Sequence, residues 1–374
     1  MKIIIGADLV PTEENYEEFE SGNIASLADE RILNALKNAD YRIFNNELAL
    51  TDKNTPIRKA GPNIKAPTAT INGIKALGAD LLGISNNHIL DHGYEGFVST
   101  IETLNRAQIA HVGGGFDKEE AKKPYYFEKD GIRAGVYACC EHEFSWVEGY
   151  GFGANGFDPL ESLDDITEAK KQCDYLIVLY HGGKEHYRYP SPHLRKVCRK
   201  IIEKGADIVL CQHTHCVGTE EDYKGGKIIY GQGNFIFAKN YANIESWGEG
   251  FLVEVKIEKG KNPSYGYIPY NKTEKGVKYD ETGDIIKGFK TRSEEIKAAG
   301  FIEQTFVNMA KEIVVARYVR HVLGYMPSEE ELNVRLIPLF HFAECDVHHE
   351  CLITGLRAVG GLGKYGEFKD LNKR

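Results

Sequence analysis

The early part of the chain alternates short apolar runs with segments of helical periodicity. Ile3-Ile4-Ile5 and the run from Asp80 to Ile84 have the length and composition of strands. Amphipathic helix patterns extend from about Asn23 to Asn38, from Thr68 to Leu77 and from Tyr94 to Arg106. This alternation predicts β-α-β units and therefore an α/β fold.

A second pattern begins at Asp130-Gly131, which lies between two segments of alternating polarity. This dipeptide in that setting is the strongest short-range signal for a β-hairpin, so we expect the sheet to become antiparallel there. Farther along, Tyr175–Leu179 and Asp207–Leu210 have the composition of buried strands. A helix is expected between them, from Ser191 to Lys204.

The 374 residues exceed what a single hydrophobic core usually supports. The later segments favour helix, notably from Glu294 to about Arg320, from Ser328 to Leu339 and from Leu352 to Val359. We therefore predict a main domain of residues 1–270 and a mainly helical C-terminal extension of residues 271–374.

The charge pattern argues against nucleic acid as a partner, because the net charge is -9 and basic residues are scattered among acidic ones. The first apolar stretch is shorter than the core of a signal peptide, and no apolar run approaches the roughly 20 residues that span a bilayer. Eight cysteines without an export signal fit reduced thiols. We expect a cytoplasmic protein with no direct membrane insertion.

Metal-capable side chains follow the predicted strands at five places. They are Asp8, Glu47, Asn87 with His88, His181, and His213 with His215. Taken singly, such residues are more often helix caps, turn formers or hydrogen-bonded structural groups. Because the carboxyl ends of strands in an open α/β sheet share one crevice, five polar strand ends in succession favour a joint site.

Carboxylate, amide and imidazole ligands together suit divalent ions such as Mn, Zn or Fe, and we expect one or two ions. A pair of ions about 3.5–4 Å apart can hold the attacking and leaving oxygens of a displacement, which predicts a metal-dependent hydrolase. Gln212-His213-Thr214-His215 directly follows a strand. Extended backbone there would direct the two imidazoles toward neighbouring ion positions.

In order and spacing, these residues resemble the CapA/PgsA-type poly-γ-glutamate capsule synthesis family, whose domain is similar to calcineurin-like metallophosphoesterases. The resemblance spans about residues 1–260. It is carried by Gly6-Ala7-Asp8, Asn46-Glu47, Ser85-Asn86-Asn87-His88 with Asp91 and Gly93, His181-Gly182-Gly183-Lys184-Glu185, Gln212-His213-Thr214-His215 and Gly231-Gln232-Gly233-Asn234-Phe235. It implies a metallophosphoesterase-like mixed β-sheet sandwich flanked by helices, and a phosphoesterase-like hydrolase activity.

The resemblance also implies a set of metal ligands. Glu47 would stand where a carboxylate bridges two ions. The other ligands would be Asp8 and His215 on one ion, and Asn87, His181 and His213 on the other.

Further roles follow from the same resemblance. His88 would act as general acid or stabilise the leaving oxygen, and Asp91 would orient its ring. Glu185 and Asn234 would line the pocket or support the ligands. Arg188 is a candidate for pairing with an anionic substrate, or else an ordinary solvated residue.

Two features depart from the family pattern. Metallophosphoesterases usually have Asp-x-His at the first strand, whereas Asp8-Leu9-Val10 leaves one ion a ligand short. Capsule-synthesis members usually carry an N-terminal membrane anchor, and we expect none here. The leading hypothesis is hydrolysis or binding of an anionic small molecule or a polyglutamate-like substrate. The alternatives are a soluble phosphoesterase of small-molecule metabolism and a non-enzymatic polyanion-binding accessory protein.

A second cluster of potential ligands lies in the C-terminal extension, at His341, Cys345, His348, His349 and Cys351. Helical spacing would place His341, Cys345 and either His348 or His349 near one face. A second metal site is one interpretation. We favour packing, because buried cysteines and capping histidines are common and the spacing matches no recognised zinc motif.

Overall fold

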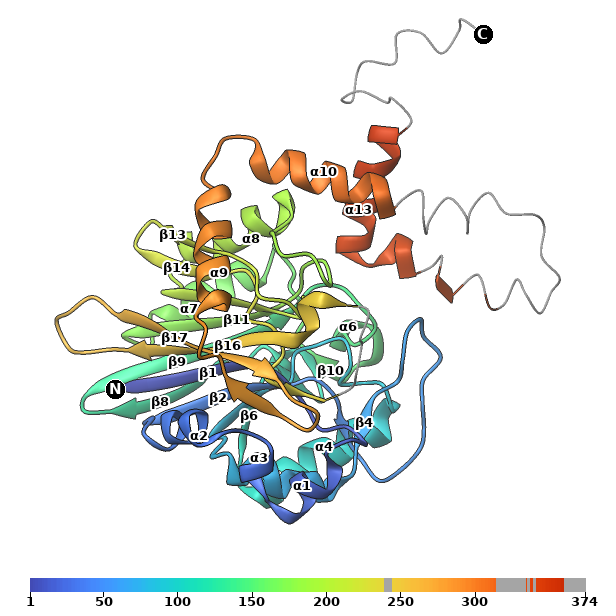
Figure 1. Cartoon of the computed structure of the whole chain (residues 1–374). Coiled ribbons are helices and arrows are strands. Elements are labelled where there is room, and N and C mark those ends of the chain that lie inside the picture. The colour runs from blue at the N-terminus through green and yellow to red at the C-terminus, as the bar shows by residue number, and fades with distance from the viewer. Residues whose placement is uncertain (239–243, 314–333, 335–336, 339–340, 360–374) are drawn as a thin grey trace, which may run out of the picture.

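Two β-sheets pack face to face in the part of the chain that the structure describes. The computed structural model describes residues 1–238, 244–313, 334, 337–338 and 341–359. Helices lie against the outer faces of both sheets (Figure 1). The mixed α/β sandwich flanked by helices is therefore confirmed.

The first sheet contains both parallel and antiparallel strands. Its described strands are β1 (Lys2–Val10), β2 (Tyr41–Asn46), β5 (Leu81–Gly83), β6 (Ala110–Val112), β15 (Ile236–Phe237), β16 (Glu249–Lys256), β17 (Ser264–Lys272) and β18 (Val277–Tyr279). The order is β18-β17-β16-β1-β2-β5-β6, and β15 pairs with the end of β1. The four strands β1, β2, β5 and β6 run parallel, as the β-α-β pattern predicts.

The second sheet has the order β13-β14-β12-β11-β9-β8 among the described residues. These strands are β8 (Tyr125–Lys129), β9 (Ile132–Cys140), β11 (Tyr175–His181), β12 (Ile208–Gln212), β13 (Glu220–Tyr223) and β14 (Gly226–Ile229). The predicted hairpin is confirmed, because β8 and β9 pair antiparallel around Asp130 and Gly131, whose φ values are 54° and 70°. Two short pairs complete the strands, β3 (Ala49–Leu50) with β4 (Lys65–Ala66) and β7 (Gly114–Gly115) with β10 (Gly153–Ala154).

The strands of the first sheet contribute to two apolar cores. Ile3 and Ile5 face the space between the sheets, where they join Leu179 and Leu210 of the second sheet. Ile4 belongs to the core beneath the helices. A strand covered on both faces needs no polar side, which explains the three consecutive isoleucines.

Helices complete both layers. The described helices are α1 (Tyr16–Ser21), α2 (Glu30–Lys37), α3 (Ile71–Ala76), α4 (Gly93–Ala107), α5 (Lys118–Ala121), α6 (Val147–Tyr150), α7 (Ser162–Lys170), α8 (Pro192–Glu203), α9 (Asp284–Glu295), α10 (Phe301–Ile313) and α13 (Asp346–Val359), with the 3₁₀ turns η1 (Ile24–Ser26), η2 (Thr68–Thr70) and η3 (Glu245–Gly248). Helices α1 to α4 pack on the first sheet, and α7 and α8 pack on the second.

Two of the predicted helices are wrong in extent. The segment from Asn23 to Asn38 forms η1 and α2 separately, because Asp29 is extended and its side chain accepts a hydrogen bond from the Ile32 nitrogen, which caps α2. The helix predicted from Glu294 begins later, because α9 ends at Glu295, Gly300 has a φ of 76° in the connection, and α10 begins at Phe301.

The C-terminal part packs α10 against α13 through Phe306, Ala310 and Cys351 (Figure 1). The first sheet continues past the predicted boundary at residue 270, since β17 ends at Lys272 and β18 follows it. The division into residues 1–270 and 271–374 stays a prediction.

Two parts of the predicted C-terminal helices lie outside the described residues. They are residues 314–320 of the first predicted helix and most of Ser328–Leu339. Within the described ranges, no helix has the length and apolar character needed to cross a bilayer. The cytoplasmic location stays a prediction.

Candidate metal centre

Six of the predicted ligands converge at one edge of the sandwich, from both sheets. The first sheet provides Asp8 in β1, Glu47 after β2 and Asn87 after β5, and the second provides His181 at the end of β11 with His213 and His215 after β12. Each of the six is at most 6% exposed. The expectation that the ligands lie at the crevice of a single open sheet is therefore wrong, because the strands of two sheets provide them.

The side chains form two overlapping groups of possible donors. Glu47, His181 and His213 each offer one atom, and these atoms lie within 4.8 Å of one another; Asp8, Glu47 and His215 do the same. Glu47 Oε1 is 3.3 Å from His181 Nε2 and 3.9 Å from His215 Nε2. One carboxylate thus belongs to both groups.

Asn87 lies beside the first group. Its Oδ1 is 3.0 Å from His181 Nε2, so the amide oxygen and the imidazole nitrogen are in hydrogen-bond contact. On the other side, His215 Nδ1 is 3.4 Å from Asp8 Oδ2. The membership of both groups is the one that the resemblance implies.

A cation fits this arrangement because the Glu47 carboxylate makes no hydrogen bond with the described residues. Its side chain is 0% exposed, and neither of its oxygens has a hydrogen-bond partner among the described residues. His213 Nδ1 is buried and unpartnered in the same sense. Burying a carboxylate without compensation is costly, and a divalent ion held by imidazole and carboxylate removes that cost.

The electrostatics of the site also favour positive charge. Burial acts to lower the pKa of His215, but Glu47 and Asp8 outweigh it and raise the pKa to about 10. Burial acts to raise the pKa of Asp8, and the hydrogen bond and charge of His215 with the charge of His181 bring it below its usual value. The carboxylates therefore hold a proton on His215 when they have no other cation.

The backbone of the two histidines after β12 differs from the sequence-based expectation. His213 and His215 have φ values of 83° and 54°, so the chain is left-handed at both and not extended. The chain leaves β12 at Gln212, and the His213 nitrogen donates a hydrogen bond to Asp8 Oδ2 of the first sheet at 3.4 Å. This unusual backbone still directs one imidazole to each donor group.

His88 and Asp91 form a contact pair next to the ligands. His88 Nδ1 is 2.6 Å from Asp91 Oδ2, and Asp91 is fully buried. Lys59 also reaches the pair, with Nζ 3.1 Å from His88 Nδ1 and in ion-pair contact with Asp91. Burial acts to raise the pKa of Asp91, but His88 and Lys59 hold it below its usual range. The Nδ1 side of the His88 ring is therefore engaged by Asp91 and Lys59.

Comparison with known proteins assigns the chain to a family. Residues 3–239 match the family described as bacterial capsule synthesis protein PGA_cap. The chain belongs to this family. It is 28% identical over 255 residues to the capsule biosynthesis protein CapA of Bacillus anthracis, a match that covers 63% of this chain and 59% of that protein. It is 27% identical over 240 residues to the PGA biosynthesis protein CapA of Bacillus subtilis, with 62% and 61% covered.

The chain therefore spans about three fifths of the length of these two relatives. Among solved structures, a hypothetical protein from Thermus thermophilus is 14% identical, with a TM-score of 0.47 and with 73% of this chain and 100% of that chain covered.

The first strand of this PGA_cap-family chain provides a single donor to the site. Leu9 and Val10 follow Asp8 and are buried in the apolar core under the helices, at 0% and 1% exposure. No imidazole stands there, so the group of Asp8, Glu47 and His215 has one potential ligand fewer than the Asp-x-His pattern would give.

Asn45 is a part of the site that the sequence analysis missed. Its Nδ2 donates to Asp8 Oδ1 at 2.7 Å and is 3.2 Å from His181 Nδ1, so it ties a residue of one sheet to a residue of the other. The sequence could have indicated this residue. Asn45 lies in β2, two positions before Glu47, and side chains two positions apart along a strand point to the same face. Such supporting groups orient metal ligands.

Of the three remaining predicted site residues, two interact with this centre and one does not. Asn234 Oδ1 is 2.8 Å from His215 Nδ1, which makes it a support for that ring. Burial acts to raise the pKa of Glu185, but the charges of Lys184, His213 and His215 lower it. Arg188 is engaged elsewhere, in an ion pair with Glu249, a residue that begins β16.

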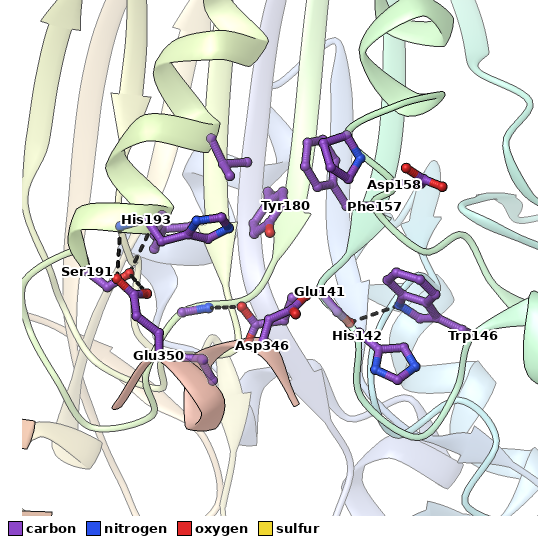
Figure 2. Close-up of a pocket in the computed structure, with 15 residues that line it drawn as sticks. Glu141, His142, Trp146, Phe157, Asp158, Tyr180, Ser191, His193, Asp346 and Glu350 are labelled. Atoms are coloured by element: carbon purple, nitrogen blue, oxygen red, sulfur yellow. Dashed lines mark hydrogen bonds between the residues drawn. The ribbon is translucent and has the colours of Figure 1, made fainter. Parts of the chain in front are cut away.

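A separate pocket of about 400 Å³ lies beside the centre, between the second sheet and α13 (Figure 2). Glu141 Oε2 accepts a hydrogen bond from the Gly183 nitrogen at 3.0 Å, and Glu350 of α13 accepts one from Ser191 Oγ at 2.6 Å. None of the predicted ligands is among its described lining residues. The pocket is thus formed where α13 docks and is distinct from the ligand groups.

Proposed function

We propose that this PGA_cap-family chain is a hydrolase that depends on one or two divalent ions and acts on an anionic substrate. The observation that carries the proposal is the buried carboxylate of Glu47, unpartnered among the described residues and shared by two groups of imidazole and carboxylate donors. Asp8 and His215 would hold one ion with Glu47. Asn87, His181 and His213 would hold the other.

A bound divalent ion supplies Lewis acidity and lowers the pKa of water, which is the chemistry that hydrolysis near neutral pH requires. The side chains of the protein would donate the proton and orient the ligands. Asp91 and Lys59 fix the His88 ring through its Nδ1 side, so that Nε2 can donate a proton to the leaving oxygen. Asn45 and Asn234 keep Asp8 and His215 in place before substrate arrives.

The substrate is proposed to be anionic because cationic groups lie close to the donors. The Lys59 side chain is 2% exposed and Lys184 is 6% exposed. The charge of Lys184 acts on the pKa of both Glu185 and His213, which places the ammonium near the His213 side of the centre. Since relatives are named for capsule and PGA biosynthesis, a polyglutamate-like polymer or an anionic precursor is the substrate class we propose.

The test is turnover of a panel of phosphate mono- and diesters and of poly-γ-glutamate by the purified full chain, with and without added Mn²⁺. We expect Mn²⁺-dependent turnover of at least one anionic substrate that is abolished in His213→Ala. His111→Ala is the matched control, because His111 lies on β6 and belongs to neither donor group. Turnover that survives both chelation and His213→Ala would contradict the proposal.

A second candidate is a non-enzymatic accessory protein that binds polyanions. The observation in its favour is the apolar environment of Leu9 and Val10, which leaves the Asp8 group with three carboxylate and imidazole donors. Tight binding of poly-γ-glutamate without turnover, undiminished by chelation, would favour this candidate over hydrolysis.

A further inference from the structure

A third group of potential donors lies in the C-terminal extension, beyond the residues that match the family. His341, Cys345 and His348 each offer one ligand atom, and these atoms lie within 4.8 Å of one another. The rings of His341 and His348 are 4.6 Å apart between centroids and nearly perpendicular, at 68°. Cys345 is 1% exposed and His348 is 9% exposed. The group is therefore compact and largely shielded from water.

Local backbone structure explains why these three residues meet. The Cys345 nitrogen donates to the His341 oxygen at 3.0 Å, and the His349 nitrogen donates to the Cys345 oxygen at 2.8 Å. The chain thus follows a helical path, on which positions spaced by four and then three share a face. His348 is the histidine on that face, and His349 is exposed.

A carboxylate from another part of the fold reaches the same group. Glu143, in the loop after β9, has Oε1 3.3 Å from His341 Nε2. The ring of the next residue, Phe144, stacks on His341 with centroids 4.7 Å apart and an angle of 18°. The second carboxylate oxygen, Oε2, is buried and has no hydrogen-bond partner among the described residues, although His213 Nε2 is 3.8 Å away. Glu143 therefore lies between the third group and the candidate metal centre.

We propose that His341, Cys345 and His348 form a further metal site, selective for Zn²⁺ and chemically similar ions, with Glu143 on its remaining side. One thiolate, two imidazoles and a carboxylate make a donor set that zinc accepts in tetrahedral sites. Sulfur distinguishes this site from the central one, whose donors are nitrogen and oxygen, and disfavours Mn²⁺ and Mg²⁺. Packing alone explains a buried cysteine or histidine, but it does not account for three donor atoms within 4.8 Å of one another with a buried carboxylate oxygen 3.3 Å from one of them.

The site would do more than stabilise the extension. Binding an ion releases the Cys345 thiol proton to solvent and joins the segment before α13 to the loop that carries Glu143. Because Glu143 contacts both His341 and His213, an ion in the third group would fix this carboxylate at the border of the central site.

Cobalt titration of the full chain tests the site, because a thiolate bound to Co²⁺ gives a near-ultraviolet charge-transfer band that nitrogen and oxygen donors do not give. We expect this band in the wild-type chain and in His213→Ala, in which the central site is damaged. It should disappear in Cys345→Ser, and His348→Gln should weaken Co²⁺ binding at this site about 100-fold or more. Cys351→Ser is the matched control, since Cys351 is a buried cysteine of α13 outside the third group and should leave the band intact.

The wild-type measurement alone can overturn the proposal, whatever happens to the folding of the variants. Absence of a thiolate band in folded wild-type protein at saturating Co²⁺ would contradict it. So would a band that persists in Cys345→Ser. Zinc analysis gives the second reading: Cys345→Ser should lose one equivalent of Zn²⁺ relative to Cys351→Ser. Because the band does not depend on the central site, its failure is distinguishable from failure of the proposed hydrolase function.

Discussion

Glu47 Oε1 lies 3.3 Å from His181 Nε2, in a place where that carboxylate is inaccessible to water and receives no hydrogen bond from the described residues. The two residues come from different sheets of the sandwich. A fold that brings an unsatisfied carboxylate against an imidazole is destabilised unless a third partner is bound. The proposed metal centre would supply such a partner.

The pair of His88 and Asp91 gives a prediction about leaving groups. Asp91→Asn should reduce kcat by about 100-fold on a substrate with a poor, alkoxide-like leaving group, because His88 loses the carboxylate that orients its ring. The defect should be much smaller on a nitrophenyl ester, whose leaving group needs little protonation. The metal content should not change.

Asp117→Asn is the control for this prediction, because Asp117 caps the short helix α5 away from the donors. Equal losses on both substrates in Asp91→Asn would show that Asp91 supports the structure and not proton donation by His88.

The sandwich core gives a prediction about stability. Leu210 is fully buried between the sheets, so Leu210→Ala should lower the free energy of unfolding by about 2–5 kcal/mol. Leu160→Ala removes the same atoms from a residue that is 84% exposed and should change stability by roughly 0.5 kcal/mol or less. Urea denaturation of both variants measures the difference, and similar effects would contradict the assignment of the core.

Glu220 makes stability depend on pH. Its carboxylate is in ion-pair contact with Lys227 and with Lys290 of α9, and it accepts a hydrogen bond from the Tyr267 hydroxyl. Burial acts to raise the pKa of Glu220, but these partners outweigh it and lower the pKa. A lowered pKa in the folded state means that the stabilisation is present above the unfolded value of about 4.5 and is lost as the pH falls.

Glu220→Gln should therefore reduce the free energy of unfolding by roughly 1–2 kcal/mol at about pH 7, allowing for partial exposure and screening, and should have little effect at about pH 3. Glu281→Gln is the control, because Glu281 pairs with Arg31 on the surface, where its side chain is 69% exposed. A Glu220→Gln effect that grows toward acidic pH would contradict the assigned sign.

The strand ends could be predicted from the sequence because each ligand lies within a few residues after a short apolar run. Glu47 and His181 are examples, and a local pattern locates both without knowledge of how the strands pair. What the pattern could not give is the pairing itself. Strands of a second sheet have the same composition as strands of the first, so the division of the ligands between two sheets became visible only in the structure.

Other features were missed because their cause is not local. Lys59 lies in a long connection between short strands, and only tertiary contacts bring it to His88 and Asp91. The left-handed backbone of His213 has no sequence signal, since such residues usually avoid it. Glu143 was missed because the residues it contacts are distant in sequence. They are His213, just after β12, and His341, before α13.

Metal content is the most direct test of the central claim. Full-chain protein purified without added metal should be exchanged against a mixture of Mn²⁺, Zn²⁺ and Fe²⁺ and analysed by elemental mass spectrometry, with Cys345→Ser as background so that the third group does not contribute. We predict one or two tightly bound equivalents of metal in this background. Adding Glu47→Gln should lower the affinity for the metal at least about 100-fold. Protein that stays metal-free under these conditions, or a metal content that Glu47→Gln leaves unchanged, would contradict a metal centre built around Glu47.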